Sequence, residues 1–336
     1  MPYQEALEAL YEVFRANGVL CKWNEPLANH TSFKIGGRAA LCVWPTGRAQ
    51  MILVLSLWRD LGDRCPLCIL GKGSNVLVSD QGFCGLVVIT TKAKRVVYEE
   101  DEVEDRESFR RGTYCRVYAE CGASLTSLAW DCGKAERGLS GLEFAYGIPG
   151  TVGGAIVMNA GAYGSDVERV LISAEYYDLS SGEVATLMDD QMELDYRHSI
   201  FLDHPDWIVL SGVFKLSFGN DEDIRDKMRV NMESRRDKQP LEYPSAGSVF
   251  KRPVDNFAAK MIDTAGLKGV TVGGAQVSEK HAGFIINREN ATAEDVRRLV
   301  FLVRAEVEKL YRYRLECEIR YISDGLDGDL GWEESE

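Results

Sequence analysis

The sequence predicts a globular protein that mixes helices with strands in two or three structural units. Three observations lead to this prediction. The chain has 336 residues, of which 45% are hydrophobic and 27% charged, a composition typical of globular proteins with more than one domain. Several segments carry apolar residues at helical spacing. Others are short runs of β-branched and apolar residues between glycines, which is typical of strands.

The N-terminal part begins with an expected amphipathic helix over residues 2–18 that stops at Gly18. Strands are expected at 68–70 and 87–91, and a further helix over 123–136. The run EEDEVEDRESFRR at 99–111 is charged throughout and indicates a surface loop or hairpin tip.

The middle of the chain predicts a hairpin with strands near 176–179 and 184–187, turning at Ser181-Gly182. A strand is expected over 207–218, followed by a helix over 221–239. The character of the chain changes after Phe218. We therefore divide it into residues 1–218, with a split near 92, and residues 219–322.

The C-terminal part predicts a long helix that starts with a capping box of Thr292 and Asp295. A strand over 315–321 follows, in which apolar and charged residues alternate. The tail over 323–336 is acidic and glycine-containing, and we expect it to be disordered. The helix carries one apolar stripe, formed by Val296, Leu299, Val300, Val303, Val307 and Leu310.

Charge and composition exclude several classes of function. A net charge of −13 argues against a general nucleic-acid binder, which needs a basic face. No apolar run approaches the ~20 residues of a membrane span, and the N-terminus does not resemble a signal peptide. We expect a cytoplasmic protein without membrane insertion, and no feature points to an obligatory protein partner.

The nine cysteines predict neither a disulfide framework nor a metal site. Their number is odd and the chain is large. Cys65 and Cys68 form a CxxC pair, but the pair leads into Ile69 and Leu70, which indicates a buried strand. A zinc site would need a second pair at ligand spacing, and the sequence has none.

Residues 142–164, LEFAYGIPGTVGGAIVMNAGAYG, form the most informative segment. It contains six glycines and a single charge, so it is too apolar for a flexible linker. The glycines could form buried turns at positive φ, or they could let the backbone approach a flat or phosphorylated ligand. The sequence of this segment leaves both open.

Residues 225–252 are basic in an otherwise acidic protein. They include eight lysines and arginines and only four acidic residues. The stretch is either a helix surface covered by salt bridges or an anion site for a phosphorylated substrate.

Seven segments in order resemble one family, the UDP-N-acetylenolpyruvoylglucosamine reductases, and they span nearly the whole chain. Any one motif would be weak evidence, but seven in order make a chance match improbable. They are NHTSF at 29–33, GKGSNVL at 71–77, the glycine segment at 142–164, YRHSIF at 196–201, PSAGSVFK at 244–251, GGA at 273–275 and ECEIR at 316–320.

This resemblance implies an α+β fold. The N-terminal region would bind FAD through two subdomains of the vanillyl-alcohol-oxidase (PCMH) type, and a C-terminal α+β domain would bind the substrate. The direct connection from Lys238 to Ser248 resembles the shorter of the two family types. The implied reaction reduces the enolpyruvyl group of a nucleotide sugar with hydride that passes from NADPH through FAD.

The resemblance also implies roles for individual residues. Arg197 and Glu318 would stabilise the developing negative charge, and Ser248 would donate the proton; we infer that Glu318 is protonated in this step or acts through a proton relay. Substrate-binding candidates are Lys238, Lys251, Arg252 and Arg320. The implied FAD-binding residues are Gly71, Lys72, Gly73, Ser74, Asn75, Gly147, Ile148, Pro149, Thr151, Gly153, Gly154, Asn159 and Gly164.

Two alternatives and two departures accompany the resemblance. The chain could be a flavin- or nucleotide-sugar-binding protein that has lost catalysis, although Arg197, Ser248 and Glu318 together argue against this. It could also be another oxidase of the same flavin fold. Cys317 stands where the family commonly has proline, and Tyr146 where a small residue is usual.

Overall fold

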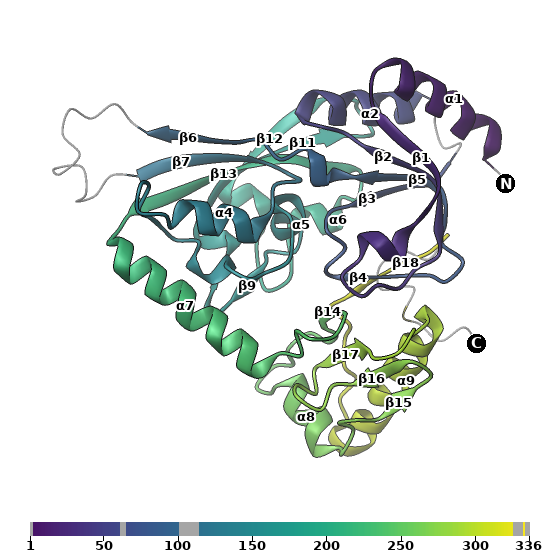
Figure 1. Ribbon diagram of the computed structural model, residues 1–336, viewed down its shortest axis with the longest axis vertical. Helices are drawn as coiled ribbons and strands as arrows, with labels where there is room; N and C mark the ends of the chain where they lie inside the picture. Colours follow the sequence, from purple (N-terminus) through teal and green to yellow (C-terminus); the bar gives the residue numbers. More distant parts are fainter. Residues whose placement is uncertain (1–2, 61–64, 101–113, 325–331, 333–336) are drawn as a thin grey trace.

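The computed structural model describes residues 3–60, 65–100, 114–324 and 332. The chain forms three packed parts, two above and one below in Figure 1, with the long helix α7 (Asp221–Lys238) running from the second part to the third. Apart from Glu99 and Glu100, which end strand β6, the charged run at 99–111 lies outside the described residues.

The first part is a four-stranded sheet with the order β1-β2-β5-β3. Helix α1 packs on this sheet through Leu7, Leu10 and Phe14, and it ends before Gly18, whose φ of +70° suits a helix C-terminus. No helix in the described ranges is long and apolar enough to cross a bilayer. The elements are α1 (Gln4–Ala16), β1 (Leu20–Pro26), β2 (Arg38–Trp44), α2 (Arg48–Asp60), β3 (Leu67–Leu70) and β5 (Phe83–Ile89).

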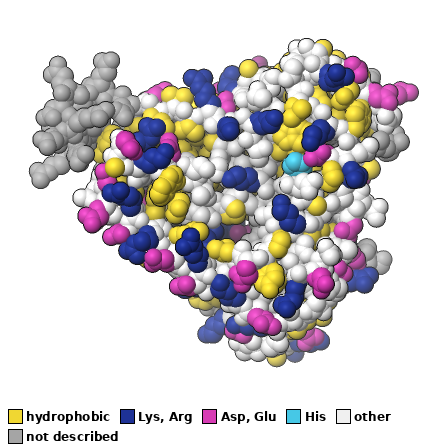
Figure 2. All heavy atoms as spheres, viewed as in Figure 1, with side chains coloured by type: hydrophobic (Ala, Val, Ile, Leu, Met, Phe, Trp, Pro, Cys, Tyr) yellow, Lys and Arg dark blue, Asp and Glu magenta, His cyan; other side chains and the backbone are white. Residues whose placement is uncertain are grey.

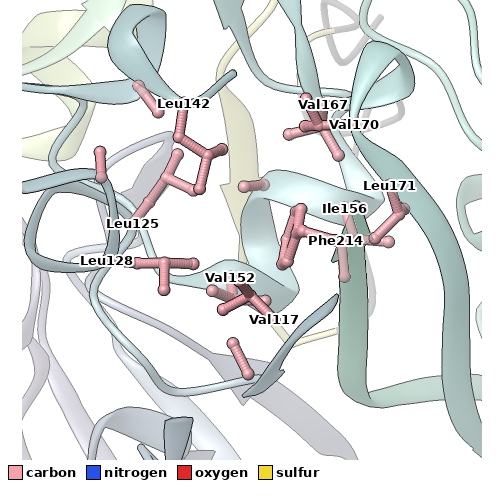
Figure 3. Packing of buried hydrophobic residues seen from close by; sticks show 14 of the residues in the cluster. Val117, Leu125, Leu128, Leu142, Val152, Ile156, Val167, Val170, Leu171 and Phe214 are labelled. Carbon is pink, nitrogen blue, oxygen red and sulfur yellow. The ribbon is translucent and has the colours of Figure 1, made fainter. Parts of the chain in front are cut away.

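The second part is a larger sheet with the strand order β12-β11-β13-β7-β6, and β8 also pairs with β13. Figure 3 shows its core, where Leu125 and Leu128 of α4 and Ile156 of α5 meet Val117 of β7 and Phe214 of β13. The strands are β6 (Val96–Glu100), β7 (Tyr114–Glu120), β8 (Leu139–Ser140), β11 (Leu171–Asp178), β12 (Val184–Met188) and β13 (Trp207–Phe218). The helices are α4 (Leu125–Cys132), α5 (Val152–Val157) and α6 (Ile200–Asp203), and β9 (Gly161–Ala162) pairs with β10 (Ser165–Asp166).

The third part is a four-stranded sheet with the order β14-β17-β16-β15, packed against α8 and α9. Strand β18 leaves this part and pairs in parallel with β4 beside the first sheet, so the C-terminal segment joins two parts of the molecule (Figure 1). The elements are β4 (Val76–Val78), β14 (Ser245–Ser248), α8 (Ala258–Thr264), β15 (Thr271–Val272), β16 (Ala275–Val277), β17 (Phe284–Asn287), α9 (Ala293–Tyr311) and β18 (Arg320–Ile322).

Most predicted elements are confirmed. The hairpin turns at Ser181-Gly182, and the capping box of Thr292 and Asp295 starts α9. The strand predicted at 87–91 ends at Ile89, because Thr90 begins a short 3-10 helix. Leu310 is 61% exposed, so the apolar stripe of α9 ends at Val307.

The strand predicted over 315–321 is only partly regular. Leu315, Cys317, Ile319 and Tyr321 are all buried, as the alternation predicts. The regular strand is restricted to residues 320–322, because residues 316–318 pair with residues 249–251 through an isolated antiparallel bridge between Cys317 and Phe250, whereas Arg320 bonds to Asn75.

Candidate active site

An ion pair between Arg197 and Glu318 joins residues 121 positions apart in the chain. The Nε of Arg197 donates to Oε1 of Glu318 at 2.5 Å, and the two side chains are only 20% and 13% exposed. The guanidinium also donates to the carbonyl oxygens of Asn159 and Gly161, at 3.5 and 3.1 Å. The second part of the molecule therefore fixes the direction of Arg197 towards the C-terminal segment.

Backbone bonds fix Glu318 from two sides. Its N–H donates to the carbonyl of Val249 at 2.7 Å, and its carbonyl accepts from Nδ2 of Asn75 at 3.1 Å. Val249 directly follows Ser248, and Asn75 ends the GKGSN segment. The glutamate thus lies where the predicted FAD loop and the predicted proton donor meet.

Burial raises the pKa of Glu318, and the positive charges of Arg197 and Lys251 oppose this shift. The raised pKa favours the protonated carboxyl. The ion pair with Arg197 favours the carboxylate. A raised pKa is one of the properties that a proton-donating carboxyl needs.

Ser248 ends strand β14, opposite Phe284 of β17. The preceding Gly247 has φ +82°, and a Cβ at this position would meet no heavy atom within 4 Å. The backbone at the end of β14 therefore borders open space. The hydroxyl of Ser32 donates to the carbonyl of Ser245 at 2.7 Å and so ties this strand to the NHTSF segment of the first part.

The two segments predicted to bind FAD contact each other. A Cβ added to Gly71 would lie 2.4 Å from Oγ1 of Thr151, and one added to Gly150 would lie 3.8 Å from Oγ of Ser74. Lys72 reaches the same region, where its Nζ donates to Oγ of Ser124 at 2.6 Å. Residues 71–75 and 147–154 thus form one structure, which we call the glycine cradle.

The glycines of the cradle have different roles. Gly73 has φ +59°, and a Cβ added there would lie 2.3 Å from the carbonyl oxygen of His30. A Cβ added to Gly153 would lie 2.9 Å from Cβ of Cys121. At these two positions other protein atoms already fill the space that a side chain would need. Gly154 and Pro149 are exposed, so one part of the cradle is packed and another is open to a ligand.

Asn159 and Gly164 lie beyond the cradle. Asn159 is buried, and its amide is used within the protein: Nδ2 donates to the carbonyl of Asp195 at 2.9 Å, and Oδ1 accepts from the N–H of Glu168 at 3.0 Å. Its visible role is to hold the loop that carries Arg197. Gly164 has φ +79°, and an added Cβ there would meet nothing within 4 Å.

The four substrate-binding candidates have different surroundings. Lys251 forms an ion pair with Glu316 at 3.4 Å, and the N–H of Arg252 donates to the hydroxyl of Tyr196 at 3.1 Å. Arg320 is exposed at the start of β18, and its N–H bonds to the carbonyl of Asn75. Lysine and arginine side chains surround the hollowed middle of the face shown in Figure 2.

Lys238 lines a cavity of about 240 Å³ at the end of α7. The salt-bridged surface is found in one part of the basic stretch, and the anion site stays a prediction. In the middle of α7, Arg229 forms ion pairs with Asp226 and Glu233 at 3.2 Å each. The end of the helix instead faces the cavity, which is lined by Ala162, Tyr163, Ser234, Arg235, Lys238, Gln239 and His281.

Comparison with known proteins agrees with this arrangement. Residues 239–322 match the C-terminal domain of UDP-N-acetylenolpyruvoylglucosamine reductase, and residues 39–188 match an FAD binding domain. UDP-N-acetylenolpyruvoylglucosamine reductase of Clostridium tetani is 40% identical over 96% of this chain and 98% of its own length. The enzyme of that name from Caldanaerobacter subterraneus is 44% identical over 90% of this chain and 93% of its own length.

The chain belongs to the UDP-N-acetylenolpyruvoylglucosamine reductase family.

A solved structure extends the likeness to the fold. The reductase of this family from Thermus caldophilus has a TM-score of 0.69 and 29% sequence identity, and the match covers 91% of this chain and 99% of that one. The predicted family and the predicted α+β fold, with its PCMH-type FAD-binding region, are confirmed.

The two departures from the family pattern are both accommodated. Cys317 is buried, and its Sγ accepts from Nη2 of Arg304 at 3.3 Å. Tyr146 stacks on Trp130, with ring centroids 5.6 Å apart. Neither residue disturbs the bonds that fix Glu318.

Sequence reasoning did not single out Arg235, although it lies in the basic stretch. Only 8% of this arginine is exposed, and its Nη1 donates to the carbonyl of Gly147 in the cradle at 2.8 Å. Its Nε has no hydrogen-bond partner among the described residues, and the side chain lines the cavity at Lys238. A buried donor left without a partner is costly, which marks Arg235 as a residue whose position needs an explanation beyond packing.

Proposed function

We propose that the chain carries out the reaction of its family, the NADPH-dependent reduction of UDP-N-acetylenolpyruvoylglucosamine to UDP-N-acetylmuramate through FAD, in peptidoglycan synthesis. The observation that carries this proposal is the buried Arg197–Glu318 pair, bonded to both the FAD loop and the strand of Ser248. We place the activity in the cytoplasm, on a small nucleotide-sugar substrate.

The glycine cradle has the features that an FAD diphosphate requires. Its residues are small, so that a ligand can come close to the backbone, and Lys72 adds a positive charge. Arg235 provides a buried donor beside it. FAD supplies the hydride chemistry when bound. The protein's own task is to place the substrate and to move the proton.

Arg197 and Glu318 would act on charge that develops on the substrate. Hydride addition to the enolpyruvyl double bond leaves negative charge that spreads onto the neighbouring carboxylate, and a fixed guanidinium stabilises it. Burial raises the pKa of Glu318. In its protonated form the carboxyl carries no charge and does not repel this anion. Ser248 would protonate the adjacent carbon, since it lies on the strand bonded to Glu318 through Val249.

The cavity at the end of α7 would bind the substrate diphosphate. Lys238 and Arg235 supply its positive charge, and charged donors bind phosphate oxygens strongly. Lys251, Arg252 and Arg320 would contact the rest of the substrate from the C-terminal side. In this proposal residues 1–218 bind FAD and residues 219–322 bind the substrate.

An anaerobic titration tests the proposed function. The visible spectrum of the protein with FAD is recorded, NADPH is added, and enolpyruvyl-UDP-N-acetylglucosamine follows. We expect the flavin band to bleach with NADPH and to return with the substrate. A flavin that NADPH bleaches but the substrate does not restore would contradict the proposed acceptor, and a protein that binds no FAD would contradict the cradle.

A further inference from the structure

Trp332 is buried in the core of the third part, although it lies in the acidic tail. It is 1% exposed, and its Nε1 donates to the carbonyl of Ile319 at 2.9 Å. Its ring also lies beside Tyr321, with centroids 5.8 Å apart. The match to the family's C-terminal domain ends at residue 322, so Trp332 lies ten positions beyond the matched domain.

Arg304 of helix α9 connects this tryptophan to the segment that carries Glu318. Its Nη1 donates to the carbonyl of Trp332 and its Nε to the carbonyl of Leu315, both at 2.9 Å. Its Nη2 donates to Sγ of Cys317 at 3.3 Å. A guanidinium holds three partners in a rigid plane, so Arg304 fixes the tail and residues 315–317 relative to each other.

These contacts hold the residues on either side of Glu318 in the chain. Cys317 and Ile319, on either side of it, are both buried, whereas Glu318 points to Arg197. Cys317 is held by Arg304, and Ile319 by Trp332. The two loops at Val249 and Asn75 hold the backbone of Glu318 itself.

We propose that Trp332 and Arg304 form a clamp that positions Glu318 for the proposed reaction. Both are positioning residues, because they act through Cys317 and Ile319 and contact neither Arg197 nor Ser248. Residues 316–318 pair with residues 249–251 through an isolated antiparallel bridge between Cys317 and Phe250, and the clamp adds restraint at Leu315, Cys317 and Ile319. A misplacement of about 1 Å can lower an enzymatic rate by about a hundredfold. This inference rests on the proposed function only for its kinetic consequence.

The variants Trp332→Ala and Trp332→Phe test the clamp, with Trp58→Phe as the matched control. Trp58 also donates from its indole to a backbone carbonyl, that of Cys65 at 3.1 Å, but in the first part of the molecule. Trp332→Phe keeps a ring in the core and removes only the bond to Ile319. The first readout is hydrogen exchange in peptides covering residues 314–322, which requires no activity.

We expect faster exchange over 314–322 in both Trp332 variants and none of this change in Trp58→Phe. We also expect reoxidation of the reduced flavin by substrate to slow about tenfold in Trp332→Ala, and less in Trp332→Phe, with flavin reduction by NADPH unchanged. Wild-type exchange in both variants would overturn the clamp, as would equal slowing of both half-reactions. Failure of the substrate to reoxidise the wild-type flavin would instead overturn the proposed function, and the exchange readout would still decide the clamp.

Discussion

The glycine cradle is built from backbone, whereas the Arg197–Glu318 centre is built from side chains. The cradle consists of two short segments that pack closely on each other because glycine has no side chain, as where Gly71 meets Thr151. The centre uses side chains from the second and third parts of the molecule, 121 positions apart. The cradle can therefore form while the centre is misaligned.

This difference separates the two half-reactions in physical terms. Reduction of the flavin needs the cradle and a hydride donor. In the proposed mechanism, reoxidation by the substrate needs, in addition, the fixed charge of Arg197, the proton of Ser248 and the buried carboxyl of Glu318. Substitutions in the two regions should therefore have different kinetic signatures, and the following predictions begin with the largest effect.

Arg197→Lys should slow reoxidation by substrate about 10²- to 10³-fold, the range found when one group that stabilises a developing anion is removed. Lysine keeps the charge but cannot reach Glu318, Asn159 and Gly161 together as the guanidinium does. Stopped-flow absorbance of the flavin band measures the rate.

A matched control for this variant is Arg48→Lys. Arg48 forms a two-bond ion pair with Glu175, at 2.6 and 2.8 Å, away from the centre. It should leave reoxidation at the wild-type rate. Equal slowing in both variants would mean that the loss at Arg197 reflects general stability.

Gly73→Ala should weaken FAD binding by about 10- to 100-fold, because strain of 1–3 kcal/mol is expected when a side chain is forced into such a position. The added Cβ would meet the backbone of His30 and Thr31. Gly266→Ala is the control, since it has a similar φ of +73° but meets nothing within 4 Å. Fluorescence titration with FAD distinguishes them, and an equal loss in both would refute the role of the close contact.

Reoxidation by substrate should fall about tenfold for each pH unit above the pKa of Glu318 if the protonated carboxyl is required. Burial raises that pKa above the ordinary glutamate value, so the fall begins above the usual range. By the same linkage, the fold loses stability from this group as pH rises through the raised pKa.

Glu318→Gln should flatten this pH profile, and Glu316→Gln should keep it. Glu316 is the exposed neighbour in the same segment, with 67% of its side chain in solvent. A flat profile in the wild type, or full activity in Glu318→Gln, would exclude proton transfer by this residue.

Lys238→Ala should raise the KM for the substrate by about 10- to 100-fold and leave FAD binding unchanged, since a hydrogen bond to a charged group contributes about 1.5–3 kcal/mol. Lys227→Ala is the control on the same helix, where the lysine pairs with Glu143 at 3.8 Å. Steady-state kinetics with varied substrate measures both. An unchanged KM in Lys238→Ala would remove the cavity from the substrate site.

The sequence was sufficient for each glycine-rich segment of the cradle by itself, but not for the contact between the two segments or for the geometry of the centre. Motifs with glycine, serine and asparagine lie within a few residues of each other, so their local structure follows from local residues. Glu318 alone would be interpreted as a solvated strand residue. Its burial depends on Val249, Asn75 and Arg197, which come from three other segments.

Two further residues show the same limit. Arg235 looks like one of many surface cations in the sequence, and only the fold shows that its side chain is buried beside the cradle, with an Nε that finds no partner in the described part of the chain. The acidic composition of the tail predicts disorder, but one of its residues, Trp332, is buried. Composition describes a segment as a whole and misses such an anchor.

Ser248→Ala gives the most direct test of the central claim, that the proton is delivered by a centre separate from the cradle. Both half-reactions are followed by stopped flow, with Ser245→Ala in the same strand as the control. We predict that reoxidation by substrate slows at least about a hundredfold while reduction by NADPH stays within about twofold. Equal slowing of both half-reactions, or no slowing of either, would contradict the account.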